Sequence, residues 1–390
     1  MSTDAKGPNP TCRECRGVLR WDAVAQRLRC KDCGASSAAS DEGRIVEHDL
    51  EEALDQGLPR GRIGTGSRQV RCRECLAEAE VPDELAATRC EFCGSTLVLV
   101  QEAAADHFLP ESMIPFAIDR AAAVRAFRSW LGSLWLRPTN IGRAASLHEL
   151  HGVYVPYWTF SCKVTSRYSA EAGYTTYYEE ESRSGIPERR IARRRWEPCT
   201  GQRHDRYSNL LVCASRGLAS ELRAIANYFD LAGLLPYSPE YLWGFAAERY
   251  AVDLPAAWQR ARTEIERLQD DRCAADIPGD TKRGLRTTHQ IEGVRFKHVL
   301  LPLWIATYRY RGRLHRFLVN GQSGRVAGTA PYSEWKVVLT VLLILATAGA
   351  LLYFLHAREP RPQRPSLSAR SKAVVCAPCD SDNIQGLRPA

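Results

Sequence analysis

Cysteine is the residue type whose spacing in this chain most clearly permits chemistry. Eight of the fourteen cysteines form four Cys-x-x-Cys pairs within the first 93 residues. The pairs make two quartets: Cys12, Cys15, Cys30 and Cys33, then Cys72, Cys75, Cys90 and Cys93. The flanking residues repeat as well, because CREC opens each unit and RCKDCGAS corresponds to RCEFCGST. This self-similarity indicates an internal duplication.

Each quartet has the ligand spacing of a zinc ribbon. Two residues between paired cysteines let a tight turn direct both thiolates at one ion, and fourteen residues between the pairs suit a short hairpin. Gly34 and Gly94 follow the second pairs and relieve the backbone there. Four thiolates complete a tetrahedral shell without an open position, so we expect two structural zinc ions rather than catalytic ones. A redox pair would need a βαβ context and would not occur twice in groups of four.

No arrangement of catalytic groups accompanies the quartets, and we expect a non-enzymatic protein with no small-molecule substrate. The glycine-rich GRIGTG at 61–66 lacks the following GK[ST] of a phosphate-binding loop, and HELH at 148–151 is one residue short of the HExxH spacing. The isolated internal cysteines have no histidine or aspartate partner in a recognisable nucleophile motif. Buried thiols are therefore the expectation for Cys162, Cys199, Cys213 and Cys273.

The charge distribution permits anionic partners without requiring one. The formal net charge is +8, with acids and bases interspersed over most of the chain. The first quartet lies among basic residues, whereas the second lies among acidic residues that would repel phosphate. Stacking platforms for bases are essentially Trp21 and Phe92. We therefore favour ribbons that bind protein or act as spacers, and the alternative is a membrane-tethered regulator that binds nucleic acid through them.

The densest basic run of the chain lies in its middle. It consists of Arg189, Arg190, Arg193, Arg194 and Arg195. Such a run is usually a solvated face, and the sharper alternative is docking to anionic lipid or to an acidic partner.

The segment 337–355 contains nineteen residues without a charge or a proline. A helix of that length spans about 28 Å, close to the roughly 30 Å hydrocarbon core of a bilayer. Trp335 and Lys336 precede it and His356 and Arg358 follow, as expected of an interfacial belt. Buried core helices are usually shorter or more mixed, so we predict a single transmembrane helix.

Two signals for the orientation of this helix disagree. The basic residues of the tail would place the C-terminus in the cytoplasm by the positive-inside rule. That orientation would export more than 330 residues that carry eight zinc-ligand thiols and no apolar signal segment. We therefore expect the N-terminal domains in the cytoplasm and the protein in the cytoplasmic membrane, and a re-entrant segment with both ends inside stays open.

The residues between the quartets and the span predict an α+β body. Residues 121–134 have helical spacing of apolar side chains, and so do residues 253–271. Asp253 and Pro255 suit the N-cap and the first helical position of the second helix. A shorter helix is predicted at 45–54.

Two strand pairs complete the predicted body. One lies at 153–168 and the other at 299–319, just before the turn-rich NGQSG. Both contain a V-x-x-P-x-W segment, VYVPYW and VLLPLW, and we expect these segments to line one sheet. Trp158 and Trp304 should then lie in its core.

These features divide the chain into six parts. The C-terminal part is basic, and we expect it to be disordered; its Cys376 and Cys379 supply half a zinc site. The predicted parts are the first ribbon (10–36), a linker (37–69), the second ribbon (70–100), the body (105–333), the transmembrane helix (337–355) and the tail (356–390).

The ordered set of motifs resembles the bacterial membrane-anchored zinc-ribbon proteins, often labelled TFIIB-type zinc ribbon-containing. After the paired ribbons come HFLPESMIPF (107–116), GVYVPYWTF (152–160), LLPLW (300–304), NGQSGRVAG (320–328) and the hydrophobic span. The resemblance covers roughly residues 10–355. The arginine-rich tail with its CAPC pair departs from the pattern.

This resemblance implies a non-enzymatic adaptor or scaffold at the cytoplasmic membrane. Its protein partners would be SPFH (flotillin-like) or phage-shock coat proteins, and its role would be in membrane-stress response. Some relatives carry labels borrowed from the primosomal helicase because their zinc regions are similar. This chain has no phosphate-binding loop, which excludes a helicase.

Overall fold

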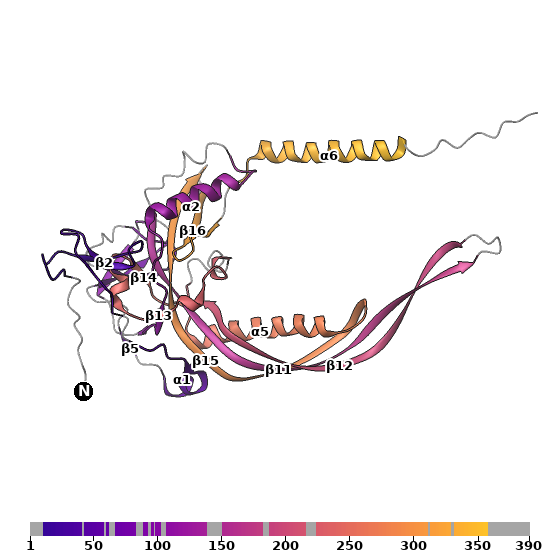
Figure 1. Ribbon diagram of the computed structural model, residues 1–390, viewed down its shortest axis with the longest axis horizontal. Helices are drawn as coiled ribbons and strands as arrows, with labels where there is room; N and C mark the ends of the chain where they lie inside the picture. The colour runs from indigo at the N-terminus through magenta and orange to yellow at the C-terminus, as the bar shows by residue number, and fades with distance from the viewer. Residues whose placement is uncertain are drawn as a thin grey trace, which may run out of the picture. The chain divides into compact units, whose positions relative to one another are not determined.

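The computed structural model describes residues 11–357 apart from 41–42, 58–59, 62–66, 83–88, 93–94, 97, 103–106, 139–149, 182–186, 216–223, 311–312 and 329–330. The chain divides into two compact units between Ser333 and Glu334. The described part of the first unit is a mixed α+β structure that contains both cysteine groups (Figure 1). The second unit contains a single described helix, α6 (Glu334–Ala357).

The first ribbon has a small sheet of its own. Strands β1 (Leu19–Asp22) and β2 (Arg27–Cys30) form an antiparallel hairpin, and β3 (Ser36–Ser37) pairs with β2. This is the hairpin that the spacing between the cysteine pairs predicts. The Asp22 carboxylate accepts hydrogen bonds from the N–H groups of Val24 and Ala25, which stabilises the turn.

Twelve of the described strands belong to one larger sheet. Its principal path runs β13 (Leu235–Pro236), β10 (Ser112–Met113), β15 (Thr281–Tyr310), β11 (His151–Glu181), β14 (Ala246–Glu248), β7 (Glu78–Pro82), β6 (Ser67–Cys72) and β8 (Val98–Glu102). Off this path, β12 (Pro187–Cys213) pairs with β11, β4 (His48–Asp49) and β16 (Arg313–Asn320) pair with β15, and β17 (Val326–Gly328) pairs with β16. Strands β5 (Arg60–Gly61) and β9 (His107–Phe108) form a separate pair.

The sheet is buried on both faces where β11 and β15 begin to pair. Val153, Tyr154, Val155, Tyr157 and Trp158 all have essentially no exposed surface. A run of buried side chains on both faces explains why VYVPYW is continuously apolar rather than alternating. Trp158 and Trp304 lie on the same face, because Gly152 pairs with Trp304 in the β11–β15 ladder. The prediction that both V-x-x-P-x-W segments line one sheet is confirmed.

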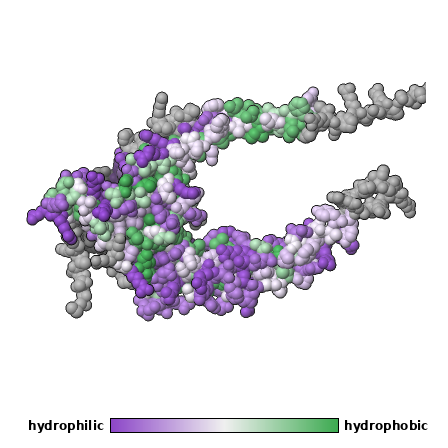
Figure 2. Space-filling view, in the orientation of Figure 1, coloured by the Kyte–Doolittle hydropathy of each residue, from purple (hydrophilic) through white to green (hydrophobic). Residues whose placement is uncertain are grey.

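The predicted strand pair at 153–168 is wrong, because β11 runs through the segment without a turn. It continues for 31 residues and pairs with β12 from Tyr157 to Glu181. Strand β15 pairs with β11 as far as Gly173, and beyond that point β11 and β12 continue as a two-stranded ribbon (Figure 1). We call the part of β11 after Phe160, the segments of β12 and β15 that pair with it, and the helix that covers them the β-arm. Residues 174–178 and 192–196 are its arm tip. Figure 2 shows hydrophilic side chains along the outer face of the arm.

Helix α5 (Leu254–Asp276) covers one face of the β-arm (Figure 1). As predicted, Asp253 is its N-cap, and the side chain accepts a hydrogen bond from the Ala256 N–H. Ala257, Ala261 and Ile265 are fully buried on the predicted apolar face. The helix extends one turn past the predicted end, so that Cys273 is buried as well.

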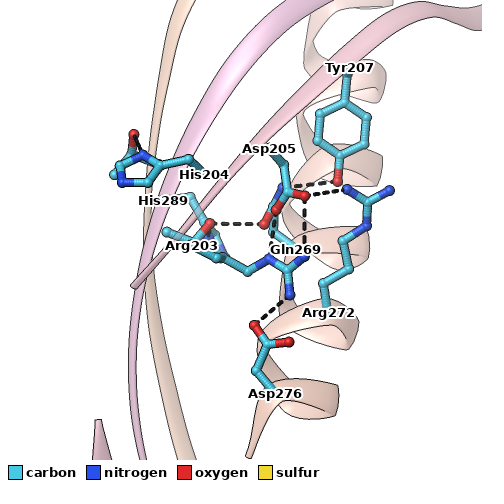
Figure 3. A network of polar contacts seen from close by, with 10 residues as sticks. Arg203, His204, Asp205, Tyr207, Gln269, Arg272, Asp276 and His289 are labelled. Atoms are coloured by element: carbon cyan, nitrogen blue, oxygen red, sulfur yellow. Dashed lines mark hydrogen bonds and ion pairs between the residues drawn. The ribbon is translucent and has the colours of Figure 1, made fainter. Parts of the chain in front are cut away.

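A polar network joins α5 to the arm (Figure 3). Arg203 on β12 donates to Asp205 at 2.6 Å and to Asp276 at the end of α5 at 2.6 Å. Arg272 of α5 also donates to Asp205, at 2.8 Å. The hydrogen bond from Arg203 holds the pKa of Asp205 at about 2, well below its ordinary value. Buried Gln269 bridges Ser166 of β11 and Tyr207 of β12.

Two shorter helices cover other parts of the sheet. Helix α2 (Arg120–Ser133) matches the predicted segment and buries Ala123, Phe127 and Leu131. Helix α1 (Leu50–Gln56) begins five residues later than the predicted helix at 45–54. The Asp49 side chain accepts hydrogen bonds from the N–H groups of Glu51 and Glu52, and this N-cap fixes the start of the helix.

In the second unit, α6 contains the predicted span. Within Glu334–Phe354 an 18-residue window has a mean hydropathy of 2.5, and none of that window is buried. Among the described helices it is the one long and apolar enough to cross a membrane. Its hydrophobic surface is visible in Figure 2. The tail 358–390, with Cys376 and Cys379, lies outside the described residues.

Candidate metal centres

The first cysteine quartet forms a compact group of sulfur atoms. The Sγ atoms of Cys12, Cys15, Cys30 and Cys33 all lie within 4.8 Å of one another. Cys12 and Cys33 approach to 3.6 Å, and Cys15 and Cys30 to 3.4 Å. These separations are far longer than the roughly 2.05 Å of a disulfide bond. The four sulfurs can therefore hold one metal ion between them.

The second quartet forms a similar group, of which three members are described. The sulfurs of Cys72, Cys75 and Cys90 also lie within 4.8 Å of one another, and Cys75 approaches Cys90 to 3.6 Å. Cys93 and the neighbouring Gly94 lie outside the described residues. Three thiols with this spacing can hold a metal ion.

The same backbone turn occurs at all four cysteine pairs. The N–H of the first cysteine of each pair donates to the carbonyl five residues later: Cys12 to Gly17, Cys30 to Ala35, Cys72 to Ala77 and Cys90 to Ser95. The residue four positions after that cysteine has positive φ wherever it is described, at 61° for Arg16, 75° for Gly34 and 59° for Leu76. Gly34 was expected there, whereas no residue type indicates a positive φ at Arg16 and Leu76, which adopt the conformation without a glycine.

Backbone N–H groups of these turns stabilise thiolate sulfur. The Gly17 N–H donates to Cys15 Sγ at 3.3 Å. The N–H groups of Cys33 and Asp32 lower the pKa of the Cys30 thiol to about 7. A lowered pKa favours the thiolate, which is the form that binds metal. The pKa values of Cys15 and Cys33 are raised instead, because each shares side-chain hydrogen bonds with neighbouring thiols, so the lowered pKa belongs to Cys30 and not to the quartet as a whole.

The two groups differ in their surroundings. Cys72 and Cys90 are 1% and 6% exposed and belong to the main hydrophobic core, together with Val70, Val81 and Phe92. Strands β6, β7 and β8 around them are part of the large sheet. In the first group Cys12 and Cys30 are equally buried, at 4% and 2%, but Cys15 and Cys33 are exposed and the surrounding sheet is separate. The second group therefore lies inside the body, and the first lies on it.

Trp21 fixes the first ribbon to the body. Its Nε1 donates to Phe116 O at 2.9 Å, and its ring packs edge-on against Tyr241 at 4.7 Å. Gln26 Nε2 donates to the same carbonyl, and the Ser40 N–H donates to Glu240 Oε2 at 2.6 Å. Sequence reasoning placed Trp21 as a stacking platform, whereas here it is 7% exposed and acts as an anchor.

The other residues singled out by sequence do not form a site. Cys162 and Cys273 are buried as expected, whereas Cys199 and Cys213 are only half-buried. Of the HELH motif, His148 lies outside the described residues, and His151 Nδ1 pairs with Glu91 Oε2 at 2.8 Å. The run of arginines lies on β12, where the side chains of Arg193, Arg194 and Arg195 are exposed on the arm tip.

A buried ionisable group around Glu111 was missed by sequence reasoning. Glu111 Oε2 accepts from the His298 N–H at 3.0 Å, and Oε1 lies 2.9 Å from His48 Nε2. Burial raises the pKa of Glu111 to about 8 and lowers the pKa of His48. With that pKa, Glu111 keeps its proton at neutral pH, and its carboxyl O–H donates a hydrogen bond to the unprotonated Nε2 of His48. Lys297 is held by Glu47 at 2.9 Å.

Replacement of Glu111 by glutamine should flatten the pH dependence of stability. The folded pKa of about 8 exceeds the ordinary 4.5, so the contribution of Glu111 is fully present below pH 4.5 and is lost as pH rises through 8. Between pH 6.5 and 8 the wild-type chain should lose about 1.5 kcal/mol more than Glu111→Gln in urea unfolding. His48 and His298 titrate below this window, because burial lowers both pKa values. Glu51→Gln on exposed α1 is the control, and equal slopes in all three proteins would contradict the prediction.

Comparison with known proteins shows a distant relationship. The chain is 28% identical over 240 residues to the uncharacterized protein YdjG of Bacillus subtilis (strain 168), a match that covers 59% of this chain and 66% of that protein. The chain thus matches just under two thirds of that protein's length. No protein-family model matches this chain, and no solved structure matches it. The chain is therefore a distant relative of an uncharacterized Bacillus protein, with two cysteine groups that can bind metal.

Proposed function

We propose that this chain is a non-enzymatic, membrane-anchored adaptor that contains two structural zinc ions and recruits a protein partner. The observation that carries the proposal is the arm tip. Among the described residues no other strand pairs with β11 or β12 there, and Tyr177 and Tyr178 are 66% and 55% exposed. A two-stranded ribbon is at best marginally stable in water by itself. A partner that covers the tip would account for its length and for its exposed side chains.

Zinc is the proposed metal because of the ligand set and the sulfur spacing. A tetrahedral site with Zn–S bonds of about 2.3 Å separates its sulfurs by about 3.8 Å. The closest sulfur contacts in the two groups are 3.4 Å and 3.6 Å, slightly shorter than this separation. All other separations between the described sulfurs of each group are at most 4.8 Å, so binding would require shifts of about 1 Å or less. All-thiolate coordination leaves no open position, which supports a structural role.

The membrane anchor in this proposal is α6. Its length and apolar composition support a single span, with the N-terminal domains in the cytoplasm. The resemblance to membrane-anchored zinc-ribbon proteins supports the cytoplasmic membrane as the location. It also supports a flotillin-like or phage-shock coat protein as the partner in membrane-stress response.

The adaptor proposal is tested by capture from detergent-solubilised membranes with the full-length chain as bait. Tyr177→Ser combined with Tyr178→Ser should reduce the recovered partner at least roughly tenfold, as expected when aromatic anchors of an interface are removed. Arg286→Ser, an exposed change on β15 of the same arm, is the matched control. Equal recovery by the wild-type chain and the double variant would contradict docking at the arm tip.

The alternative is a membrane-tethered regulator that binds nucleic acid through the ribbons. It is favoured by the exposed Arg13, Arg16 and Arg27 of the first ribbon. The adaptor proposal predicts only non-specific binding, with a Kd of roughly 10⁻⁴ to 10⁻⁶ M at physiological salt. A nanomolar, sequence-selective complex of the full chain with DNA or RNA would establish the alternative.

A further inference from the structure

A short turn after α2 connects the body to the start of α6. The Arg137 N–H donates to Leu134 O at 3.3 Å, and within this turn the Leu136 carbonyl accepts from the Ser333 N–H at 2.7 Å. Buried Ser333 is the last residue of the first unit, and α6 begins at the next residue. Counted bond by bond, the Cα atom of Trp135 therefore lies within roughly 15 Å of the first Cα atom of α6.

Aromatic side chains are exposed on both segments that meet at this junction. Trp135 is 80% exposed, more than any other aromatic side chain among the described residues. Tyr332 and Trp335 are 74% and 63% exposed. Tryptophan and tyrosine are enriched where a membrane meets water, because their rings are apolar at one end and form hydrogen bonds at the other. Trp135 therefore has the chemistry of an interfacial residue, although it lies far before the span in the sequence.

The exposed side of α2 is basic, and we call this side, together with Trp135, the α2 face. Arg125 and Arg128 lie about one turn apart on it and are exposed, and the described structure gives neither an ion-pair partner. From 120 to 137 the sequence has four arginines and no acidic residue. Strands β16 and β17, on which the helix packs, contain no acidic residue either (Figure 1). The α2 face therefore attracts anions.

The start of α6 sets the depth of the junction in a bilayer, if α6 is the anchor proposed above. The uncharged span begins at Val337, which follows Glu334 by three residues. At 1.5 Å per residue, an upright helix places Glu334 about 5 Å from the hydrocarbon core. The headgroup layer on each side of the core is roughly 5 to 7 Å thick. The junction therefore lies in the headgroup layer, within reach of Trp135.

We propose that the α2 face rests on an anionic bilayer surface, with the Trp135 ring among the headgroups and Arg125 and Arg128 against lipid phosphates. This inference rests on the proposed membrane anchor and is independent of the arm tip. A bilayer is the occupant that the observations favour, because the α2 face adjoins the start of the span and its charge is opposite to that of anionic lipid. The cytoplasmic leaflet contains the anionic lipids, which agrees with the proposed orientation.

The test uses quenching of tryptophan fluorescence by lipids that carry bromine in the upper acyl chain. The full-length, metal-loaded chain is reconstituted in vesicles of equal parts phosphatidylcholine and phosphatidylglycerol. The contribution of Trp135 to the emission is the difference between the wild-type chain and Trp135→Phe. Brominated lipid should quench most of this contribution. In vesicles of phosphatidylcholine alone it should quench clearly less.

Arg125→Gln combined with Arg128→Gln tests the charge of the α2 face. The pair should lower the ratio of docked to undocked chains roughly tenfold or more, because each arginine beside an anionic surface contributes about fivefold. Arg260→Gln combined with Arg286→Gln, the same charge change at exposed positions of the β-arm, should leave the quenching unchanged. All substituted side chains are exposed, and a metal content equal to that of the wild-type chain checks the fold.

Hydrogen exchange gives a second measurement that needs no substitution. In the wild-type chain, the amides of residues 132–137 should exchange more slowly in the anionic vesicles than in phosphatidylcholine vesicles. Equal exchange in the two kinds of vesicle would contradict the proposal.

The proposal is overturned if the Trp135 contribution is not quenched in anionic vesicles, or is quenched equally in both kinds, while the chain resists carbonate extraction. Extraction of the chain by carbonate would contradict the anchor and this proposal with it, so the two failures are distinguishable. A Trp135 contribution that lipid does not quench, but that changes when the chain is diluted in the vesicles, would assign the α2 face to a second copy of the chain and overturn the proposal.

Discussion

Cys72→Ser is expected to release one of the two proposed zinc ions and to unfold the body, whereas Cys30→Ser should release one ion and loosen only the first ribbon. Structural zinc contributes on the order of 10 kcal/mol to the fold that encloses it. Cys72 lies in the hydrophobic core at the end of β6, within the twelve-stranded sheet. Cys30 lies in the separate three-stranded sheet, next to two exposed thiols. The same Cys→Ser substitution should therefore unfold much more of the chain at Cys72 than at Cys30.

Metal analysis and limited proteolysis of the purified, reduced chain measure both parts of this prediction. The wild-type chain should contain about two zinc ions and each variant about one. In Cys72→Ser protease should cleave the strands of the body, and in Cys30→Ser cleavage should be confined to the first ribbon. Cys162→Ser, a buried thiol of the β-arm, should retain both ions. A wild-type metal content near zero would contradict the zinc proposal. Matching cleavage patterns in the two variants would contradict the expected difference between them in the extent of unfolding.

Local signals explain the parts of the fold that could be predicted from the sequence. The Cys-x-x-Cys spacing indicated both metal-binding groups, because two cysteines in one tight turn serve one ion. Helical periodicity and the Asp253 N-cap indicated α5, and the continuous apolar run indicated α6. The sequence also contains the N-cap of α1 at Asp49, a residue type that indicates a helix start at Leu50 rather than at Ile45.

The length of β11 could not be predicted from such signals. Past Phe160 the arm strands have polar side chains on the face away from α5, and in the tip both faces are largely exposed. From Cys162 to Ala172 this alternation is present, because Cys162, Val164, Ala170 and Ala172 are buried while the odd-numbered residues between them are not. In the tip no face is deeply buried and the alternation is lost, so there the β11–β12 ladder rests on backbone pairing.

The burial of the second cysteine group in the core is indicated by its flanking residues and not by the spacing of its cysteines. Identical Cys-x-x-Cys spacing says nothing about burial. The flanking residues do, because Val70, Ala77, Ala79 and Val81 are apolar and buried, whereas the corresponding strands of the first ribbon are rich in arginine. The pairing of β14 with β7 is a long-range contact, and such contacts have no local signature.

The proposed orientation of α6 in the membrane rests on the argument that reduced thiols belong in the cytoplasm. Protease added outside intact cells should leave both cysteine groups uncleaved, since the proposed N-terminal domains are cytoplasmic. Digestion of the N-terminal part under these conditions would reverse the orientation and support the positive-inside assignment of the tail.

The proposed membrane anchor predicts that removal of α6 moves the protein completely from the membrane fraction to the soluble fraction. The apolar residues of the helix have no cover within the described second unit, and transfer of about twenty such residues into lipid is strongly favourable. The full-length chain should therefore stay in the membrane fraction during alkaline carbonate extraction. A chain that ends at residue 331 should be recovered in the supernatant with both zinc ions, because the cysteine groups belong to the first unit. A matched chain with Leu342→Ala, which keeps the span apolar, should stay in the pellet. Extraction of the full-length chain by carbonate would show that α6 does not cross the bilayer.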